Sequence, residues 1–122
     1  MLNFKEVEDF LKDNEHLLED YGIILTHIGI VRATSKKEPD KKVKALIVDY
    51  NEEDLKNLKK ELKQKYPNNL IFIKIFKGKR KVKDPIMIVS VGAKYRQEAF
   101  RLLKYIIETL KTKILKEIEI FE

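Results

Sequence analysis

The chain has 122 residues, of which 43% are hydrophobic and 38% charged, a balance that favours a folded domain over disorder. It contains no cysteine, which excludes disulfides, thiolate zinc sites, iron–sulfur clusters and a cysteine nucleophile. Lysine and arginine (26) outnumber the acidic residues (20), so the net charge of +6 favours an anionic partner. No apolar run approaches the roughly 20 residues of a membrane span, and residues 1–10 lack the apolar region of a secretory signal, which predicts a cytoplasmic protein. The abundance of lysine, glutamate and isoleucine is typical of thermophiles.

The first half of the chain alternates helical and strand patterns. Apolar residues at three- and four-residue steps predict an amphipathic helix over residues 3–20. β-branched residues then predict a buried strand over 22–31. The polar stretch 33–42 lacks any apolar period and is interpreted as a mobile surface loop, after which 43–50 returns to strand composition.

The second half begins with a helix signal. Asn51 has the character of an N-cap, and leucines follow it at helical spacing over residues 51–66. Residues 70–76 and 86–91 are apolar enough to predict two central strands separated by a basic turn. A third helix is predicted over 94–113. Its apolar stripe consists of Phe100, Leu103, Ile106, Ile107, Leu110 and Ile114.

The closing residues 116–122 alternate as in an edge strand. The resulting order, αββαββαβ, combines strands with helices that are apolar on one side. It predicts an α+β fold in which helices cover a mixed or antiparallel sheet. Residues 1–122 are expected to form a single domain.

Most catalytic motifs are missing from the sequence. His16 and His27 fall on different predicted elements without cysteine or carboxylate partners at metal-binding spacing, so no metal site is expected. No glycine-rich phosphate loop occurs, and Ser35 and Ser90 lack the setting of a nucleophile elbow. No cofactor is therefore expected.

Basic residues remain as candidates. Arg32 and Arg96 each lie where a predicted strand meets a loop or a helix start, a position that suits bidentate binding of phosphate or carboxylate. On the residues alone, a surface salt bridge is the preferred interpretation of both arginines. Lys111, Lys113 and Lys116 gather at the end of the third apolar stripe, where the helix dipole favours lysine whether or not it is functional.

A second basic stretch runs from Lys74 to Lys83, beside Phe72 and Phe76. Lysines interleaved with aromatic rings are typical of nucleic-acid-binding surfaces. A solvated hairpin turn with its aromatic rings in the core explains the same pattern. Binding of nucleic acid is therefore kept as the minority hypothesis.

Seven stretches occur together in an order that is hard to obtain by chance. They are residues 29–32, 43–50, 65–67, 78–84, 85–91, 95–100 and 110–119. As an ordered set they resemble the large subunit of molybdopterin synthase, an enzyme of molybdenum cofactor biosynthesis.

This resemblance implies an α/β hammerhead fold and a sulfurtransferase activity. In that family, the large subunit forms a central homodimer within a heterotetramer. A small ubiquitin-like subunit inserts a Gly-Gly tail that ends in a thiocarboxylate. Its sulfur converts cyclic pyranopterin monophosphate to molybdopterin, which is consistent with a large subunit without cysteine. A non-catalytic or altered paralogue is the alternative.

The resemblance also implies roles for individual residues. Arg32 and Arg96 match arginines of the anion pocket and are expected to hold the substrate phosphate. Tyr95 stands where the family commonly has histidine; its hydroxyl can hydrogen-bond an anion but does not titrate near neutral pH.

The lysines are matched in the same way. Lys111 matches the first active-site lysine, which acts near the thiocarboxylate. Lys116 is the candidate for the second catalytic lysine and Lys113 is its alternative, because the segment between the two lysines is shorter than in the family. Lys83 replaces a usual glycine before Asp84.

Overall fold

The computed structural model describes residues 3–122. The helical elements are α1 (Lys5–Asp13), the 3-10 helix η1 (Glu15–Asp20), α2 (Glu52–Lys65), α3 (Arg96–Thr109) and the π-helical turn η2 (Leu110–Ile114). The strands are β1 (Ile23–Ile30), β2 (Val43–Tyr50), β3 (Leu70–Ile75), β4 (Gly78–Lys81), β5 (Pro85–Ala93) and β6 (Leu115–Phe121). Within residues 3–122, no helix is both long and apolar enough to cross a membrane.

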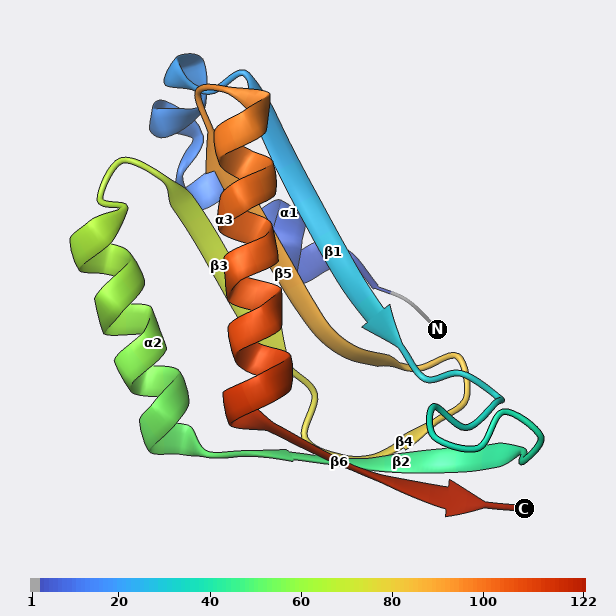
Figure 1. Cartoon of the computed structure of the whole chain (residues 1–122). Helices are drawn as coiled ribbons and strands as arrows, with labels where there is room; N and C mark the ends of the chain where they lie inside the picture. Colours follow the sequence, from blue (N-terminus) through green and yellow to red (C-terminus); the bar gives the residue numbers. More distant parts are fainter. Residues whose placement is uncertain (1–2) are drawn as a thin grey trace.

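Two three-stranded antiparallel sheets organise the molecule, in the orders β1-β5-β3 and β4-β2-β6 (Figure 1). The α+β prediction is thus confirmed, with one strand more than the predicted order. That strand, β4, lies in the expected basic turn and pairs with β2 from Ala45 opposite Lys81 to Val48 opposite Gly78. The predicted edge position of the last strand is confirmed, since β6 flanks β2.

The two strands predicted to be central differ in the structure. Every residue of β5 is buried and the strand lies in the middle of its sheet, whereas β3 forms one edge. β1, expected to be buried, forms the other edge and is mostly half-buried. The apolar composition of β1 and β3 reflects the helices that cover them rather than a central place in the sheet.

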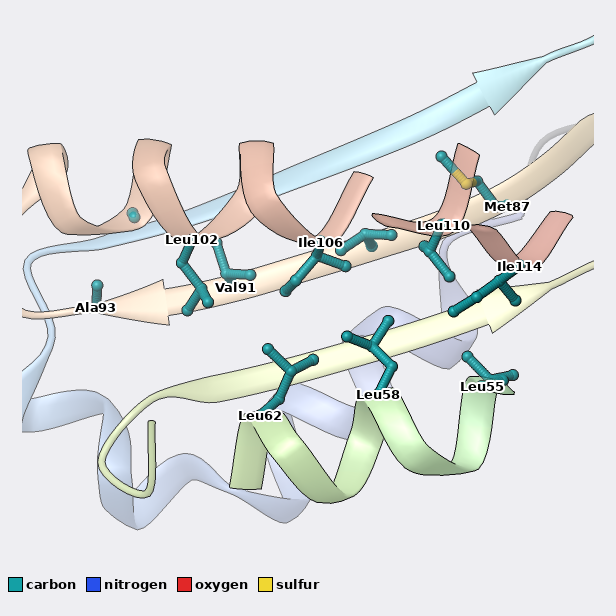
Figure 2. Close-up of a cluster of buried hydrophobic side chains, with 12 residues drawn as sticks. Leu55, Leu58, Leu62, Met87, Val91, Ala93, Leu102, Ile106, Leu110 and Ile114 are labelled. Atoms are coloured by element: carbon teal, nitrogen blue, oxygen red, sulfur yellow. The ribbon is translucent and has the colours of Figure 1, made fainter. Parts of the chain in front are cut away.

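The main core lies between the first sheet and the helices α2 and α3 (Figure 2). Leu55, Leu58 and Leu62 of α2 point toward the buried side chains of α3 and β5. On α3 the buried positions are Ala99, Leu102, Ile106 and, beyond its end, Leu110 and Ile114. The predicted stripe is therefore corrected at Phe100, which is 54% exposed because the neighbouring positions face the core.

The N-terminal segment covers the opposite side of β3, behind the sheet in Figure 1. The Phe10 ring packs 5.1 Å from the Phe72 ring, and Glu6 forms an ion pair with Lys74. The single helix predicted over 3–20 is interrupted at Asn14, whose side-chain amide donates to the Phe10 carbonyl at 2.8 Å. Such local side-chain bonds compete with continuation of the helix.

The start of α2 agrees with the sequence. The Asn51 side chain accepts a hydrogen bond of 3.0 Å from the Asp54 amide, which confirms the predicted N-cap. A second, smaller core joins the two sheets just before this helix. It consists of Val31, Leu46, Val48 and Ile86.

The turn between β4 and β5 contains a backbone conformation that is unusual for its residue. Lys83 has φ +80°, in the left-handed region that favours glycine. Its amide donates to the Val31 carbonyl at 2.9 Å, which ties the turn to the end of β1. This geometry explains why glycine is the residue expected here.

Candidate functional site

A groove of about 1210 Å³ lies where the end of β1 meets the second sheet. Its floor is apolar and its rim is charged. The apolar lining includes Val43 and Leu46 of β2, Ile86 of β5 and Ile30 at the end of β1. The floor belongs in part to the second core, so the groove rests on the contact between the two sheets.

Four cations line this groove: Arg32 after β1, Lys36 and Lys37 in the loop 33–42, and Lys111 in η2. Within residues 3–122, Arg32, Lys36 and Lys37 form no ion pair, although the carboxylates of Glu38, Glu117 and Glu119 line the same groove. The arrangement brings together two of the residues expected from the sequence, Arg32 and Lys111. It fits an anionic ligand with an apolar body.

Lys111 is the most enclosed of the candidate residues. Its Nζ donates to Glu117 Oε1 at 2.8 Å, and the two side chains are only 31% and 21% exposed. A charged bond with little solvent around it fixes the position of the ammonium group. η2 directly precedes β6, and both members of this pair line the groove.

His27 lies beside this lysine on β1. It follows Ile23 and Leu25 at two-residue spacing and thus faces the helix-covered side of the strand. Burial, and in second place the charge of Lys111, lower the pKa of His27. His27 is therefore held neutral near the candidate catalytic lysine.

The other two lysines lie outside the groove. Lys116 alternates with Glu117 along β6 and so faces the opposite side of the sheet, opposite Asp49 in the register. The exposed Lys113 contributes to the lowered pKa of Glu61 on α2, after the larger effects of the Tyr105 hydroxyl and Lys65. The groove of a single chain thus contains one of the three predicted lysines.

Tyr95 and Arg96 lie at the opposite end of α3 from Lys111. At 1.5 Å per residue, the helix separates Arg96 from Lys111 by about 22 Å along its axis. Both side chains are exposed, and Tyr95 precedes the helix in extended conformation. One chain therefore cannot bring Arg96 and Lys111 to the same small ligand.

Hydrogen bonds anchor the loop 33–42 to β6. The Ser35 hydroxyl, which is almost fully buried, donates to Glu119 Oε1 at 2.7 Å, and the Lys36 amide donates to Glu119 Oε2 at 3.0 Å. These two bonds, with smaller contributions from the charges of Lys37 and Arg32, lower the pKa of Glu119. The predicted surface loop is thus anchored to β6 at Ser35 and lines the groove, and its mobility stays a prediction.

Sequence reasoning did not single out Lys36, Lys37, Glu117 or Glu119 as site residues. Ser35 was considered only as a nucleophile, whereas in the structure its hydroxyl anchors the loop. Ser35 and Glu119 are 84 residues apart, so no local motif could mark the pair. The alternation of Glu117 and Glu119 along β6 was visible in the sequence. Which side of the sheet these glutamates face depends on the pairing of β6 with β2, and the sequence alone did not show this pairing.

Part of the basic stretch considered for nucleic acid makes contacts within the fold. Phe72 packs against Phe10, and Lys74 and Arg80 lie about 5 Å from the Phe76 ring centre, at 5.0 and 4.9 Å. Arg80 Nε also donates to the Pro85 carbonyl at 3.0 Å. The aromatic rings are thus engaged in intramolecular contacts. Among residues 3–122, no three His, Cys, Asp or Glu side chains gather to hold a metal ion.

The fold and the groove together define an α+β protein whose two sheets meet at a charged groove, lined by four cations and three carboxylates. Comparison with known families is more specific. The sequence matches the family described as MoaE protein over residues 1–113, and the chain belongs to this family. The family confirms the resemblance to the large subunit of molybdopterin synthase and supports a role in molybdenum cofactor biosynthesis.

Individual relatives are distant. An uncharacterized protein of Methanocaldococcus jannaschii is 31% identical over 115 residues, which cover 88% of this chain and 96% of that protein. Molybdopterin synthase from Staphylococcus aureus has a similar structure, with a TM-score of 0.72 and 25% identity over 85% of this chain and 77% of the other. A complex of subunits 1 and 2 of molybdopterin-converting factor from Helicobacter pylori superposes with a TM-score of 0.75 at 18% identity, over 99% and 80% of the chains.

Proposed function

We propose that this chain is the catalytic subunit of a molybdopterin synthase. It would transfer sulfur from the thiocarboxylated Gly-Gly tail of a small ubiquitin-like subunit to cyclic pyranopterin monophosphate. Family membership supports the proposal, and the similarity to a two-subunit complex supports a small-subunit partner. The cytoplasm and a thermophilic source stay predictions.

One observation carries the proposal: Arg32 and Lys111 line the same groove. The reaction would bring two anions together, the substrate phosphate and the thiocarboxylate. Their mutual repulsion is reduced when cations surround both groups in a partly enclosed site. In this assignment Arg32 holds the phosphate, and Lys111, oriented by Glu117, stabilises negative charge near the reacting sulfur.

A complete site would need a second copy of the chain. Because α3 separates Arg96 from Lys111, Tyr95 and Arg96 can serve the groove only if a partner copy presents them. Exposed Tyr95 and Phe100 beside Arg96 support a contact at this end of the helix. The expected assembly is a homodimer within a heterotetramer.

Lys116 and Lys113, the two candidates for the second catalytic lysine, lie outside the groove. Lys116 stays a predicted catalytic residue, although its strand position directs it toward Asp49. Lys113 stays its alternative. The placement of Lys116 and the tyrosine at position 95 favour a second candidate function, a paralogue that binds the small subunit without chemistry.

Single-turnover conversion of the pterin with a thiocarboxylated small subunit tests the proposal. The variant Lys111→Ala is expected to lower the rate by about a hundredfold or more, since a charge-stabilising group is lost. Lys104→Ala, an exposed lysine seven residues earlier on α3, is the matched control and should retain activity within twofold. Full activity of Lys111→Ala would refute the assignment, and small-subunit binding without any product would favour the inactive paralogue.

Mixing two inactive variants tests the shared site. If Arg96 acts across a dimer, Lys111→Ala and Arg96→Ala proteins exchanged at equal amounts form heterodimers with one intact site. Half of the dimers are mixed and each has one of two sites, so activity should recover to about a quarter of the wild-type value. No recovery after verified exchange would place Arg96 outside the site.

A further inference from the structure

The loop 33–42 contributes two lysines to the groove, and nothing in the family resemblance explained them. Lys36 and Lys37 line the groove together with Arg32. The loop's acidic residue in the groove, Glu38, is already paired with Lys41 at 2.9 Å. Lys36 and Lys37 form no ion pair with Glu38 and add positive charge to the groove, next to the Glu119 carboxylate.

Two residues determine where these lysines lie. Ser35 is 3% exposed, and its oxygen accepts hydrogen bonds from the amides of Lys37 at 3.2 Å and Glu38 at 3.0 Å while it donates to Glu119. The same carboxylate also binds the Lys36 amide. The backbone of both lysines is thus fixed to β6 through one serine and one glutamate.

Further contacts close the base of the loop. Val43 donates to the Ala33 carbonyl at 2.8 Å, and Thr34 pairs with Lys42. Lys41 Nζ lies 5.0 Å from the centre of the Phe121 ring on β6. Because these contacts hold the base of the loop, loss of the Ser35–Glu119 hydrogen bond would release only the tip of the loop, which carries Lys36 and Lys37.

We propose that Lys36 and Lys37 are anion-binding residues of the groove, and that Ser35 and Glu119 are positioning residues that hold them beside Arg32. The ligand class is a phosphate ester. The inference rests on the proposed function for the identity of the substrate, but the anion site itself does not depend on sulfur transfer. A fixed backbone lowers the entropy lost when two flexible lysines close on an anion.

Titration of the full chain with inorganic phosphate, followed by amide chemical shifts, tests the site. The double variant Lys36→Ala/Lys37→Ala should weaken phosphate binding about tenfold, and the adjacent pair Lys59→Ala/Lys60→Ala on α2 controls for the same loss of charge. Equal effects of the two double variants would mean a general charge effect and would overturn the site.

Ser35→Ala tests positioning without changing charge. It should weaken phosphate binding about three- to tenfold, the equivalent of one or two hydrogen bonds. In the background of Lys36→Ala/Lys37→Ala this effect should vanish, because Ser35 acts through the two lysines. An unchanged affinity, or effects that simply add, would overturn the positioning role.

Two glutamates of the same strand provide a test of sign. Glu117→Gln removes a negative charge from the groove and should strengthen phosphate binding. Glu119→Gln removes the same charge but also weakens the loop contact, and should weaken binding. Tighter binding in both variants would reduce Glu119 to a plain electrostatic role and contradict the proposal.

These outcomes are separable from those of the proposed function. Loop-dependent phosphate binding in a protein that forms no sulfurated product would preserve the anion site and refute the synthase. Normal product formation together with unchanged phosphate affinity in Ser35→Ala would support the synthase and refute the positioning role of Ser35.

Discussion

The two sheets of the molecule are built on different kinds of contact. The first, β1-β5-β3, buries every residue of its central strand, and the face of that strand toward α2 and α3 belongs to the large apolar core. The second, β4-β2-β6, has a smaller core and is extended by polar and charged contacts between distant segments. Stability should therefore reside mainly in the first sheet, and ligand recognition in the second.

This division has a physical reason. Apolar burial is insensitive to the detailed position of a side chain, so it makes a rigid base but gives little chemical discrimination. Charged hydrogen bonds depend on geometry, so the second sheet can place cations at defined points around a groove. A groove at the contact between the sheets combines a stable apolar base with charged groups held at defined points.

The largest expected effect separates the two regions by stability. Ile106→Ala removes a side chain of α3 that is fully buried under the first sheet, and should destabilise the protein by about 2 to 5 kcal/mol. Ile118→Ala on β6, where the side chain is 64% exposed, should change stability by less than about 0.5 kcal/mol. Urea unfolding of both variants measures the difference, and similar losses would contradict the division.

Sequence reasoning succeeded where periodicity and local signals determine the structure. The leucines after Asn51 and the N-cap itself were predicted because a helix repeats within a few residues. The register of the third stripe was off at Phe100 because Leu102 and Leu103 are both apolar, and only packing decides which one faces the core.

The site was harder to predict. Arg32 and Lys111 were proposed from the family resemblance, and they lie in one groove. The contribution of Lys36, Lys37 and Ser35 to this groove depends on contacts with β6, which lies more than 70 residues away in the sequence. β4 was missed because GKRK is too short and polar to show strand periodicity, and pairing with β2 stabilises it. Long-range pairing of this kind leaves no local trace.

A second prediction concerns backbone strain beside the groove. Lys83→Gly places glycine at φ +80°, which relieves the steric cost of a side chain in the left-handed region. Part of the gain is offset by the greater freedom of glycine in the unfolded chain, so the expected stabilisation is about 0.5 to 1 kcal/mol. Lys81→Gly in β4 is the control and should destabilise the protein. Thermal unfolding distinguishes the two, and destabilisation by Lys83→Gly would show that no strain is stored there.

The smallest effect is a pH dependence of stability that reports on the contact between the two regions. His27 lies on the first sheet, and the cation beside it, Lys111, belongs to the groove. Because burial and Lys111 lower the pKa of His27, the unfolded chain takes up a proton at His27 before the folded chain does as the pH falls. The free energy of unfolding should therefore be at its full value above about pH 6.5 and decrease as the pH falls below it toward the lowered pKa.

The variant His27→Phe removes this dependence while it keeps a ring of similar size. His16→Phe, at an exposed position of η1, is the matched control. The acidic residues with lowered pKa, such as Glu119, lose their contribution only below about pH 4.5, so the two pH windows do not overlap. An unchanged slope between pH 6.5 and 5 in His27→Phe would mean that His27 does not feel burial and Lys111 as inferred. A flatter slope in Lys111→Ala as well would demonstrate that charge at the groove reaches the first sheet.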